Sequence, residues 1–168
     1  LKIENLEALK TGCENLKTHA ENVQKYGLPV VVAINRFPTD TPAELEIVSK
    51  YCEEIGVESS LSEVVARGGE GGIDLANKIK RIVDETPGTP NFYYKNTDPI
   101  KRKIETVARE IYRADGVDFT EEAEASILRL EENGLADWPI CMAKTQASLS
   151  DDPKKRNAPR GWRLQVRE

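Results

Sequence analysis

Residues 29–41 constrain the fold more than any other segment of this chain. They run Pro-Val-Val-Val-Ala-Ile-Asn-Arg-Phe-Pro-Thr-Asp-Thr, so an apolar stretch stops at Asn35 and a polar turn containing Phe37 follows. An apolar run without polar alternation is typical of a strand buried on both faces of a parallel sheet. Ligands of open α/β sheets bind just beyond the carboxyl ends of such strands. We therefore expect function to be concentrated between Asn35 and Thr41.

Helix signals follow this turn and recur along the chain. Thr41 offers an N-cap oxygen, Pro42 suits the first helical position, and Glu44 completes a capping box. Apolar residues at steps of three and four predict an amphipathic helix over 4–26. The same signals predict further helices that begin near Ile73, at Pro99 with Asp98 as the cap, and at Thr120.

Short apolar or alternating segments between these helices predict strands. They lie at 29–34, 57–61, 91–95, 139–143 and 162–168. Helices that alternate with short strands indicate an α/β fold, here part of a three-layer sheet with flanking helices. The strands are few for so many helices, the chain starts at Leu1 rather than Met, and it stops inside a strand-like pattern. We therefore expect it to be part of a longer polypeptide.

Composition excludes several classes of function. The net charge of −5 gives no general attraction for nucleic acid or an anionic membrane, and no apolar run has the length needed to span a bilayer. Cys13, Cys52 and Cys141 lie far apart, without the spacing of a zinc site or a disulfide framework. Reduced, mostly buried thiols in a cytoplasmic protein are the expected result, with no metal site.

The turn after the apolar run offers the first chemistry. Asn35 and Asp40 can present amide and carboxylate groups to the edge of a purine, or they can simply shape the turn and cap the helix. Phe37 is costly to expose, so it packs either under the loop or on a flat ligand. The residue types leave both alternatives open.

Two further segments have weaker signals. Gly68, Gly69, Gly71 and Gly72 precede a helix, and they suit either an anion cradle or a tight crossing of two backbones, although Glu70 opposes an anion. No GxxxxGKS or GxxxxGKT occurs in the chain, so this is not a P-loop. Lys144 could neutralise an anion, and Asp151 with Asp152 could help hold a cation, or the segment is a solvated loop.

The order of several motifs resembles one family. The chain is similar to formate–tetrahydrofolate ligase, also called formyltetrahydrofolate synthetase, over essentially its whole length. The motifs are Glu4-Asn-Leu-Glu-Ala-Leu9, Asn15-Leu with His19 and Glu21-Asn, the segment 29–41, Gly68-Gly-Glu-Gly-Gly72, Ile111-Tyr-Arg-Ala-Asp-Gly-Val117, and Met142-Ala-Lys-Thr-Gln146 with Ser150-Asp-Asp-Pro153.

The resemblance implies an ATP-dependent ligase of one-carbon metabolism. Such enzymes convert formate to formyl phosphate and formylate N10 of tetrahydrofolate, using magnesium and a monovalent cation. The fold implied is a P-loop NTPase-like multidomain enzyme whose P-loop lies N-terminal to this portion. Residues 1–115 would end its nucleotide- and folate-binding domain, and 116–168 would start a smaller α+β domain. The parent enzyme is expected to be a homo-oligomer.

Site residues follow from the same resemblance. Asn35 and Asp40 match the nucleotide-facing loop, while Phe37 and Leu61 match positions that pack on folate. Val65 occupies the position where the family usually has a tryptophan that stacks on folate, so stacking is lost. Arg113 stands where glycine is usual. No catalytic residue is assigned.

Two functions follow. The chain is an enzyme part that is inactive alone, or it is a non-catalytic folate- or nucleotide-binding or assembly module derived from that enzyme.

Overall fold

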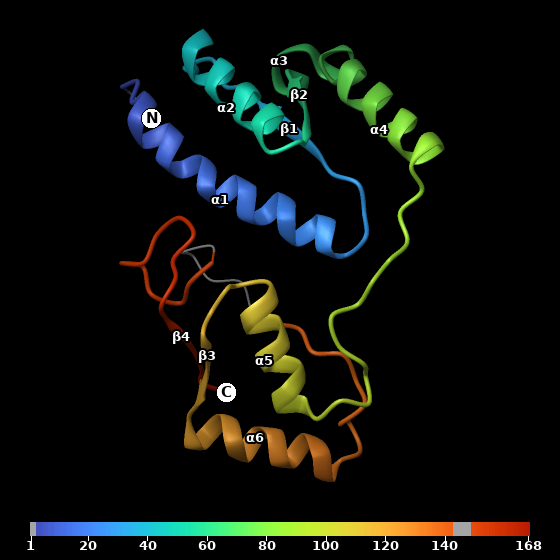
Figure 1. The fold of residues 1–168 in the computed structure, drawn as a ribbon, viewed down its shortest axis with the longest axis vertical. Coiled ribbons are helices and arrows are strands. Elements are labelled where there is room, and N and C mark those ends of the chain that lie inside the picture. The colour runs from blue at the N-terminus through green and yellow to red at the C-terminus, as the bar shows by residue number, and fades with distance from the viewer. Residues whose placement is uncertain (1–2, 143–148) are drawn as a thin grey trace. The chain divides into compact units, whose positions relative to one another are not determined.

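The computed structural model describes residues 3–142 and 149–168 of the chain. The chain divides into two compact units, Leu1–Asn91 and Phe92–Glu168 (Figure 1). Each unit contains its own parallel pair of strands together with helices, which confirms the predicted α/β class. The domain boundary predicted after residue 115 concerns the whole enzyme and stays a prediction. In this chain, residues 92–115 group with the second unit.

The first unit follows the predicted order of helices and strands closely. The helix predicted over 4–26 begins after Asn5, whose side chain accepts a hydrogen bond from the Ala8 N–H. It ends before Gly27, where φ is +74°. The elements are α1 (Leu6–Lys25), β1 (Val31–Asn35), α2 (Pro42–Glu54), β2 (Glu58–Ser62), α3 (Val64–Arg67), the short 3-10 helix η1 (Gly68–Gly72) and α4 (Ile73–Glu85).

The capping signals at the start of α2 are confirmed. The Glu44 N–H donates to Thr41 Oγ1 at 3.2 Å, and the Thr41 N–H donates to Glu44 Oε2 at 3.0 Å. Pro42 occupies the first helical turn, where no backbone N–H is needed. This reciprocal pair fixes the residue at which the turn after β1 ends and the helix begins.

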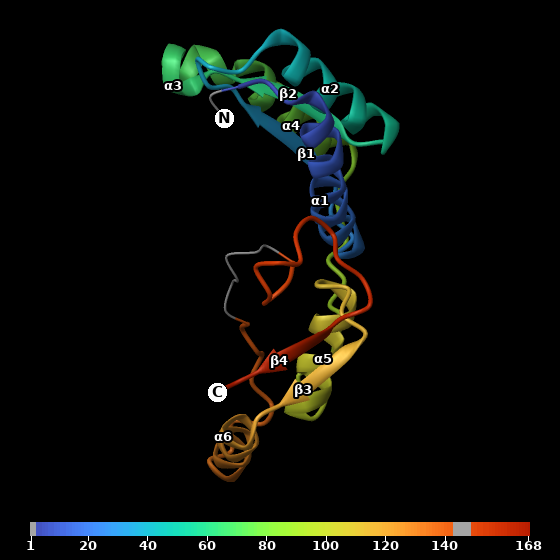
Figure 2. The same ribbon diagram turned by 90° about the vertical axis from the view of Figure 1, so that its left-hand side faces the viewer.

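The two strands of the first unit form a three-layer arrangement with α2 and α4. Successive residues of a strand point to opposite faces, so Ser59 and Ser60 mark the two faces of β2. The Ser59 hydroxyl lies 3.5 Å from the Ser49 hydroxyl of α2, while Ser60 Oγ donates to the Asp74 carboxylate of α4 at 2.6 Å. Figure 2 shows the strands from the side.

The predicted burial of β1 on both faces is wrong. Ala33 and Asn35 are exposed, and the other residues of β1 are half-buried. The reason is that β1 pairs only with β2 in the described residues, so one edge and part of each face have no cover. The parallel pairing itself, expected from the apolar run, is present from Val31 opposite Glu58 to Asn35 opposite Ser62.

Helix α4 contacts β2 through polar groups. The Lys78 ammonium donates to the Ser59 carbonyl at 2.8 Å and pairs with Asp74 at 2.9 Å, and Arg81 pairs with Glu58. The apolar residues that predicted this helix, by contrast, face solvent: Ile73, Ala76, Ile79 and Val83.

The second unit contains the larger hydrophobic core. Its elements are α5 (Ile100–Glu110), β3 (Gly116–Phe119), α6 (Glu121–Glu132) and β4 (Arg163–Val166). β3 and β4 pair in parallel, and Trp162 and Leu164 are buried while Arg163 and Gln165 are exposed, as alternation predicts. The core joins residues of α5, β3, α6 and β4 with two residues that lie just before the strands, Ala114 and Trp162. Its members are Ile100, Ile104, Ala108, Ala114, Val117, Ile127, Trp162 and Leu164.

Three local predictions for this part of the chain are wrong. Neither 91–95 nor 139–142 is a strand, because both follow irregular paths around the ends of helices. Asp98 does not cap α5; its carboxylate accepts the Lys95 N–H at 2.9 Å and closes the preceding turn. Residue 143 lies outside the described part. No described helix is both long enough and apolar enough to cross a membrane.

Candidate functional site

The carboxyl ends of β1 and β2 lie side by side and define the candidate site. Asn35 pairs with Ser62 as the last residues of the two strands, and the Arg36 N–H extends the ladder to the Ser62 carbonyl at 3.0 Å. Beyond this point the segment after β1 enters the turn before α2, and the segment after β2 enters α3. Figure 1 shows both segments at the same end of the strand pair.

The turn after β1 is shaped by Asp40. Its carboxylate accepts the Phe37 N–H at 2.7 Å, and its own N–H donates to the Phe37 carbonyl at 3.0 Å. The turn-shaping alternative is therefore present for Asp40, while helix capping belongs to Thr41. The Asn35 side chain is exposed at the strand end. A contact of either residue with a nucleotide stays a prediction.

Exposed apolar side chains gather around the two strand ends. Phe37 is 54% exposed and Val65 is 77% exposed. Leu61, the penultimate residue of β2, pairs with Ile34. We call this group the apolar edge patch, and it consists of Phe37, Leu61, Val64 and Val65.

The patch includes the three residues that the family resemblance assigned to folate: Phe37 follows the end of β1, Leu61 lies near the end of β2, and Val65 follows β2 in α3. A flat apolar ligand is the kind of partner that would cover such side chains. The folate contacts themselves stay a prediction.

The glycine-rich segment forms η1 and packs tightly under the start of α3. The Glu63 N–H donates to the Gly71 carbonyl at 3.0 Å. A Cβ on Gly71 would lie 2.5 Å from the Glu63 carbonyl carbon and oxygen, so a side chain cannot fit there. Of the two alternatives, the tight backbone crossing is thus present at Gly71. Anion binding by Gly68, Gly69, Gly71 and Gly72 stays a prediction.

A small cluster of charges borders the patch. The Arg36 guanidinium donates to Glu63 Oε1 at 2.7 Å, and the Arg67 guanidinium donates to Glu63 Oε2 at 3.1 Å. Hydrogen bonds from Arg67 and then Arg36 hold the pKa of the Glu63 carboxyl below its ordinary value. Glu63 is consequently ionised at neutral pH and joins the turn after β1 to α3.

The other candidates lie in the second unit. Lys144 is outside the described residues. The Asp151 carboxylate accepts the Gln165 N–H at 3.2 Å, and the Asp152 carboxylate accepts the Lys154 N–H at 2.9 Å. Both acids therefore organise a loop beside β4. Within residues 3–142 and 149–168, no three His, Cys, Asp or Glu side chains converge to hold a metal ion.

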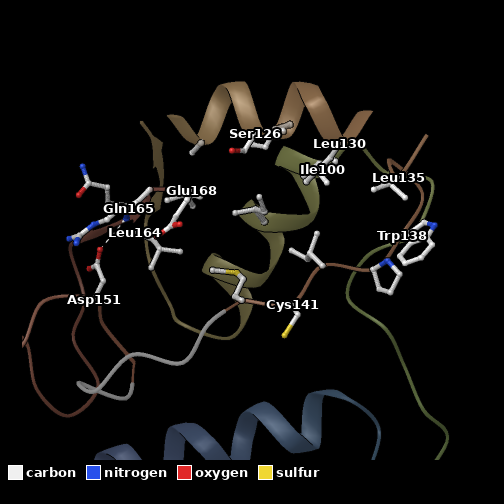
Figure 3. Close-up of a pocket in the computed structure, with 18 residues that line it drawn as sticks. Ile100, Ser126, Leu130, Leu135, Trp138, Cys141, Asp151, Leu164, Gln165 and Glu168 are labelled. Atoms are coloured by element: carbon white, nitrogen blue, oxygen red, sulfur yellow. Dashed lines mark hydrogen bonds between the residues drawn. The ribbon is translucent and has the colours of Figure 1, made fainter. Parts of the chain in front are cut away.

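A cavity in the second unit was not predicted from the sequence. The cavity of about 660 Å³ lies between α5, α6, the segment 135–142 and β4 (Figure 3). Its apolar wall includes Ile100, Leu130 and Leu164, and Asp151 and Gln165 stand at its polar end. The signal for it was the apolar run at 139–142, which the sequence assigned to a strand.

Lys103 is another residue that sequence reasoning missed. Its side chain is fully buried, and its ammonium donates to the carbonyls of Asn96 at 3.0 Å, Ala136 at 2.5 Å and Trp138 at 2.8 Å. Three acceptors replace the water that a buried ammonium would lose. Lys103 therefore joins the segments before α5 and after α6, and its role is structural.

The fold and the edge patch define a class of protein. Loops at the carboxyl ends of neighbouring parallel strands, with apolar side chains exposed, are typical of the ligand-binding part of an α/β enzyme. A comparison with protein families gives the particular family. The family model described as formate–tetrahydrofolate ligase matches residues 1–168, and the chain belongs to this family.

Proposed function

We propose that this chain supplies the folate- and nucleotide-facing edge of an enzyme that formylates tetrahydrofolate. In this proposal ATP activates formate as formyl phosphate, and the formyl group is transferred to N10 of tetrahydrofolate. Membership of the family supports the ligase class. The observation that carries the assignment of the edge is the exposure of Phe37, Leu61 and Val65 around the two strand ends.

The roles of the residues follow from their positions. Phe37 on one side and Val65 on the other flank a place for the pterin and aminobenzoyl rings, with Leu61 between them on β2. Asn35, exposed at the end of β1, offers an amide to the nucleotide. Asp40 holds the turn that presents Phe37. Lys144 is retained as a candidate partner for an anion.

Phosphate transfer requires groups that these residues do not supply. The chain contains no GxxxxGKS or GxxxxGKT, whose lysine grips terminal phosphates. We infer that turnover depends on a P-loop supplied by another segment of an enzyme of this kind. The chain by itself is expected to form no formyltetrahydrofolate from ATP, formate and tetrahydrofolate, and measurable turnover would overturn this inference.

A second candidate is a non-catalytic module that binds folate or nucleotide weakly or serves assembly. Val65 favours it, because valine has no flat face to stack on a pterin ring. The loss is about 0.5–1.5 kcal/mol beyond the burial of area.

The test of the folate assignment is a titration of the ¹⁵N-labelled chain with tetrahydrofolate, followed by NMR. We expect amide shifts at Phe37, Leu61 and Val65, and smaller changes within Phe92–Glu168. Shifts confined to the residues that line the cavity of the second unit would overturn the assignment. Adenosine and AMP, titrated in the same way, test whether Asn35 faces a nucleotide.

A further inference from the structure

Glu63 connects three segments that meet at the site. Its backbone N–H is bonded to the Gly71 carbonyl of η1. One carboxylate oxygen accepts from Arg36, which follows β1, and the other accepts from Arg67 at the end of α3. The backbone of Glu63 is thus fixed by the glycine-rich turn, while its side chain holds a residue on either side.

The bond to Arg36 joins the two segments that carry the apolar edge patch. Phe37 follows Arg36 directly, and Val64 and Val65 follow Glu63. The two flanks of the patch therefore belong to two segments. Within the described part of the chain, the Arg36–Glu63 pair is the side-chain bond that joins the turn at 36–40 to α3.

We propose that Glu63 is a positioning residue that sets the gap between Phe37 and Val65 by holding Arg36. This inference rests on the proposed function, and the ligand it serves is a flat heteroaromatic ring that enters the gap. Ring contacts are favourable only over a narrow range of separations, about 4.5–7 Å between centroids. A turn that is held before binding also loses less conformational freedom when the ligand arrives.

A purely structural role makes a different prediction. The side chains of Arg36, Glu63 and Arg67 are 44%, 22% and 56% exposed, respectively. Exposed ion pairs contribute little to the free energy of folding. Removing the Glu63 charge should therefore leave the fold intact. Any loss of ring binding then reports on the gap rather than on unfolding.

The chain provides a matched control. Glu58 and Arg81 form another ion pair in the first unit, with side chains 43% and 45% exposed, but it joins β2 to α4 away from the patch. Glu58→Gln removes a comparable charge pair without touching Arg36 or Glu63. It separates a general effect of charge from an effect on the site.

The experiment measures tetrahydrofolate affinity by NMR titration for Glu63→Gln, Arg36→Gln, the double variant and Glu58→Gln. We expect Glu63→Gln and Arg36→Gln each to weaken binding by about threefold to fivefold. The double variant should bind no more weakly than Glu63→Gln alone, because Glu63→Gln already removes the bond that Arg36→Gln breaks. Glu58→Gln should match the unchanged chain, and the melting temperatures of all four should agree closely.

Three results would overturn the inference. Unchanged affinity in Glu63→Gln, an equal loss in Glu58→Gln, or additive losses in the double variant would each show that the pair does not set the gap. In all three, the unchanged chain still binds at Phe37 and Leu61, so the proposed function survives. If tetrahydrofolate moves no amide at the patch in the unchanged chain, the proposed function fails and this inference fails with it.

Discussion

The two units of this chain bury different kinds of side chain. The apolar residues buried in the first unit are small: Cys13, Ala20, Cys52 and Val57. The second unit buries large ones, including Ile100, Ile104, Ile127, Leu149, Trp162 and Leu164. Since stability rises with the apolar area removed from water, we expect the second unit to be the more stable of the two.

The helices α4 and α5 show the same contrast locally. Both have apolar residues at helical spacing, yet α5 buries Ile100, Ile104 and Ala108 in the core, whereas α4 leaves Ile73, Ile79 and Val83 exposed. The periodicity of a sequence thus predicts a helix without predicting what covers it. In the first unit, exposure of apolar groups extends to the edge patch, which is where we place the ligand.

The largest effect is expected from Lys103→Ala in the second unit. It removes three charge-assisted hydrogen bonds and leaves a cavity, so we expect a loss of about 4 kcal/mol in the free energy of unfolding. Both tryptophans of the chain, Trp138 and Trp162, lie in this unit and report its unfolding in urea. Lys101→Ala, at a position where the side chain is 47% exposed, should cost less than about 1 kcal/mol.

A loss below about 1 kcal/mol for Lys103→Ala would mean that the buried ammonium is not a structural link.

Gly71→Ala tests the backbone crossing in the first unit. The new Cβ would overlap the Glu63 backbone, which must shift, so we expect a loss of about 2 kcal/mol together with faster hydrogen exchange in β2 and α3. Gly69→Ala is the matched control, because nothing lies within 4 Å of a Cβ at that position. Equal behaviour of the two variants would contradict the close approach at Gly71.

Alkaline pH should weaken the first unit through the contact of α1 with α2. Burial and the hydrogen bond to Glu14 raise the pKa of Tyr51 to about 12 from an ordinary value of 10.0. Below pH 10 the phenol of Tyr51 is protonated in both the folded and the unfolded state, and its contribution to stability is complete. As the pH rises from 10 to about 12, the unfolded phenol ionises first, and stability is lost.

Burial raises the pKa values of Cys13 and Cys52 as well, so they act in the same direction. Urea titrations at several pH values should show that the free energy of unfolding declines less steeply with rising pH in Tyr51→Phe than in the unchanged chain. An identical decline in both proteins would show that ionisation of Tyr51 does not cause the loss of stability.

The smallest effect, and one of opposite sign, is expected for Arg113→Gly. Arg113 has φ of +58°, a left-handed conformation in which a Cβ is strained. Glycine is more flexible than arginine in the unfolded chain, which offsets part of the relieved strain. We therefore expect a gain of about 0.5 kcal/mol in the free energy of unfolding. Asn157→Gly, with φ of +61°, should gain less, because asparagine tolerates this region. A loss in Arg113→Gly would show that its side chain contributes more than the strain costs.

Local signals in the sequence predicted much of this structure. The capping box at Thr41 and Glu44, the parallel pairing of β1 and the alternation around Leu164 depend on neighbouring residues, and all are present. Long-range packing could not be predicted in this way. Burial of β1 fails because a second neighbouring strand is not found among the described residues.

The end of β1 was predictable from the sequence, but the side-chain bonds around it were not; that this end is the ligand site stays a prediction. The strand-end rule located Asn35 and Phe37, whereas the bond from Arg36 to Glu63 joins residues far apart in the sequence. The structural role of Lys103 could not be predicted for a related reason. A lysine among charged residues on a helix is usually exposed, and only the fold brings three carbonyls to its ammonium.

The most direct test of the edge patch as the folate site is the affinity of Val65→Trp for tetrahydrofolate. Val65 is 77% exposed, so an indole fits without overpacking, and it supplies a flat face that valine lacks. Val83→Trp, at a position 64% exposed on α4, is the control for a new aromatic group on the surface.

The account predicts that Val65→Trp binds tetrahydrofolate about threefold to tenfold more tightly than the unchanged chain, while Val83→Trp does not. Equal affinities for all three proteins, or an equal gain in Val83→Trp, would contradict it.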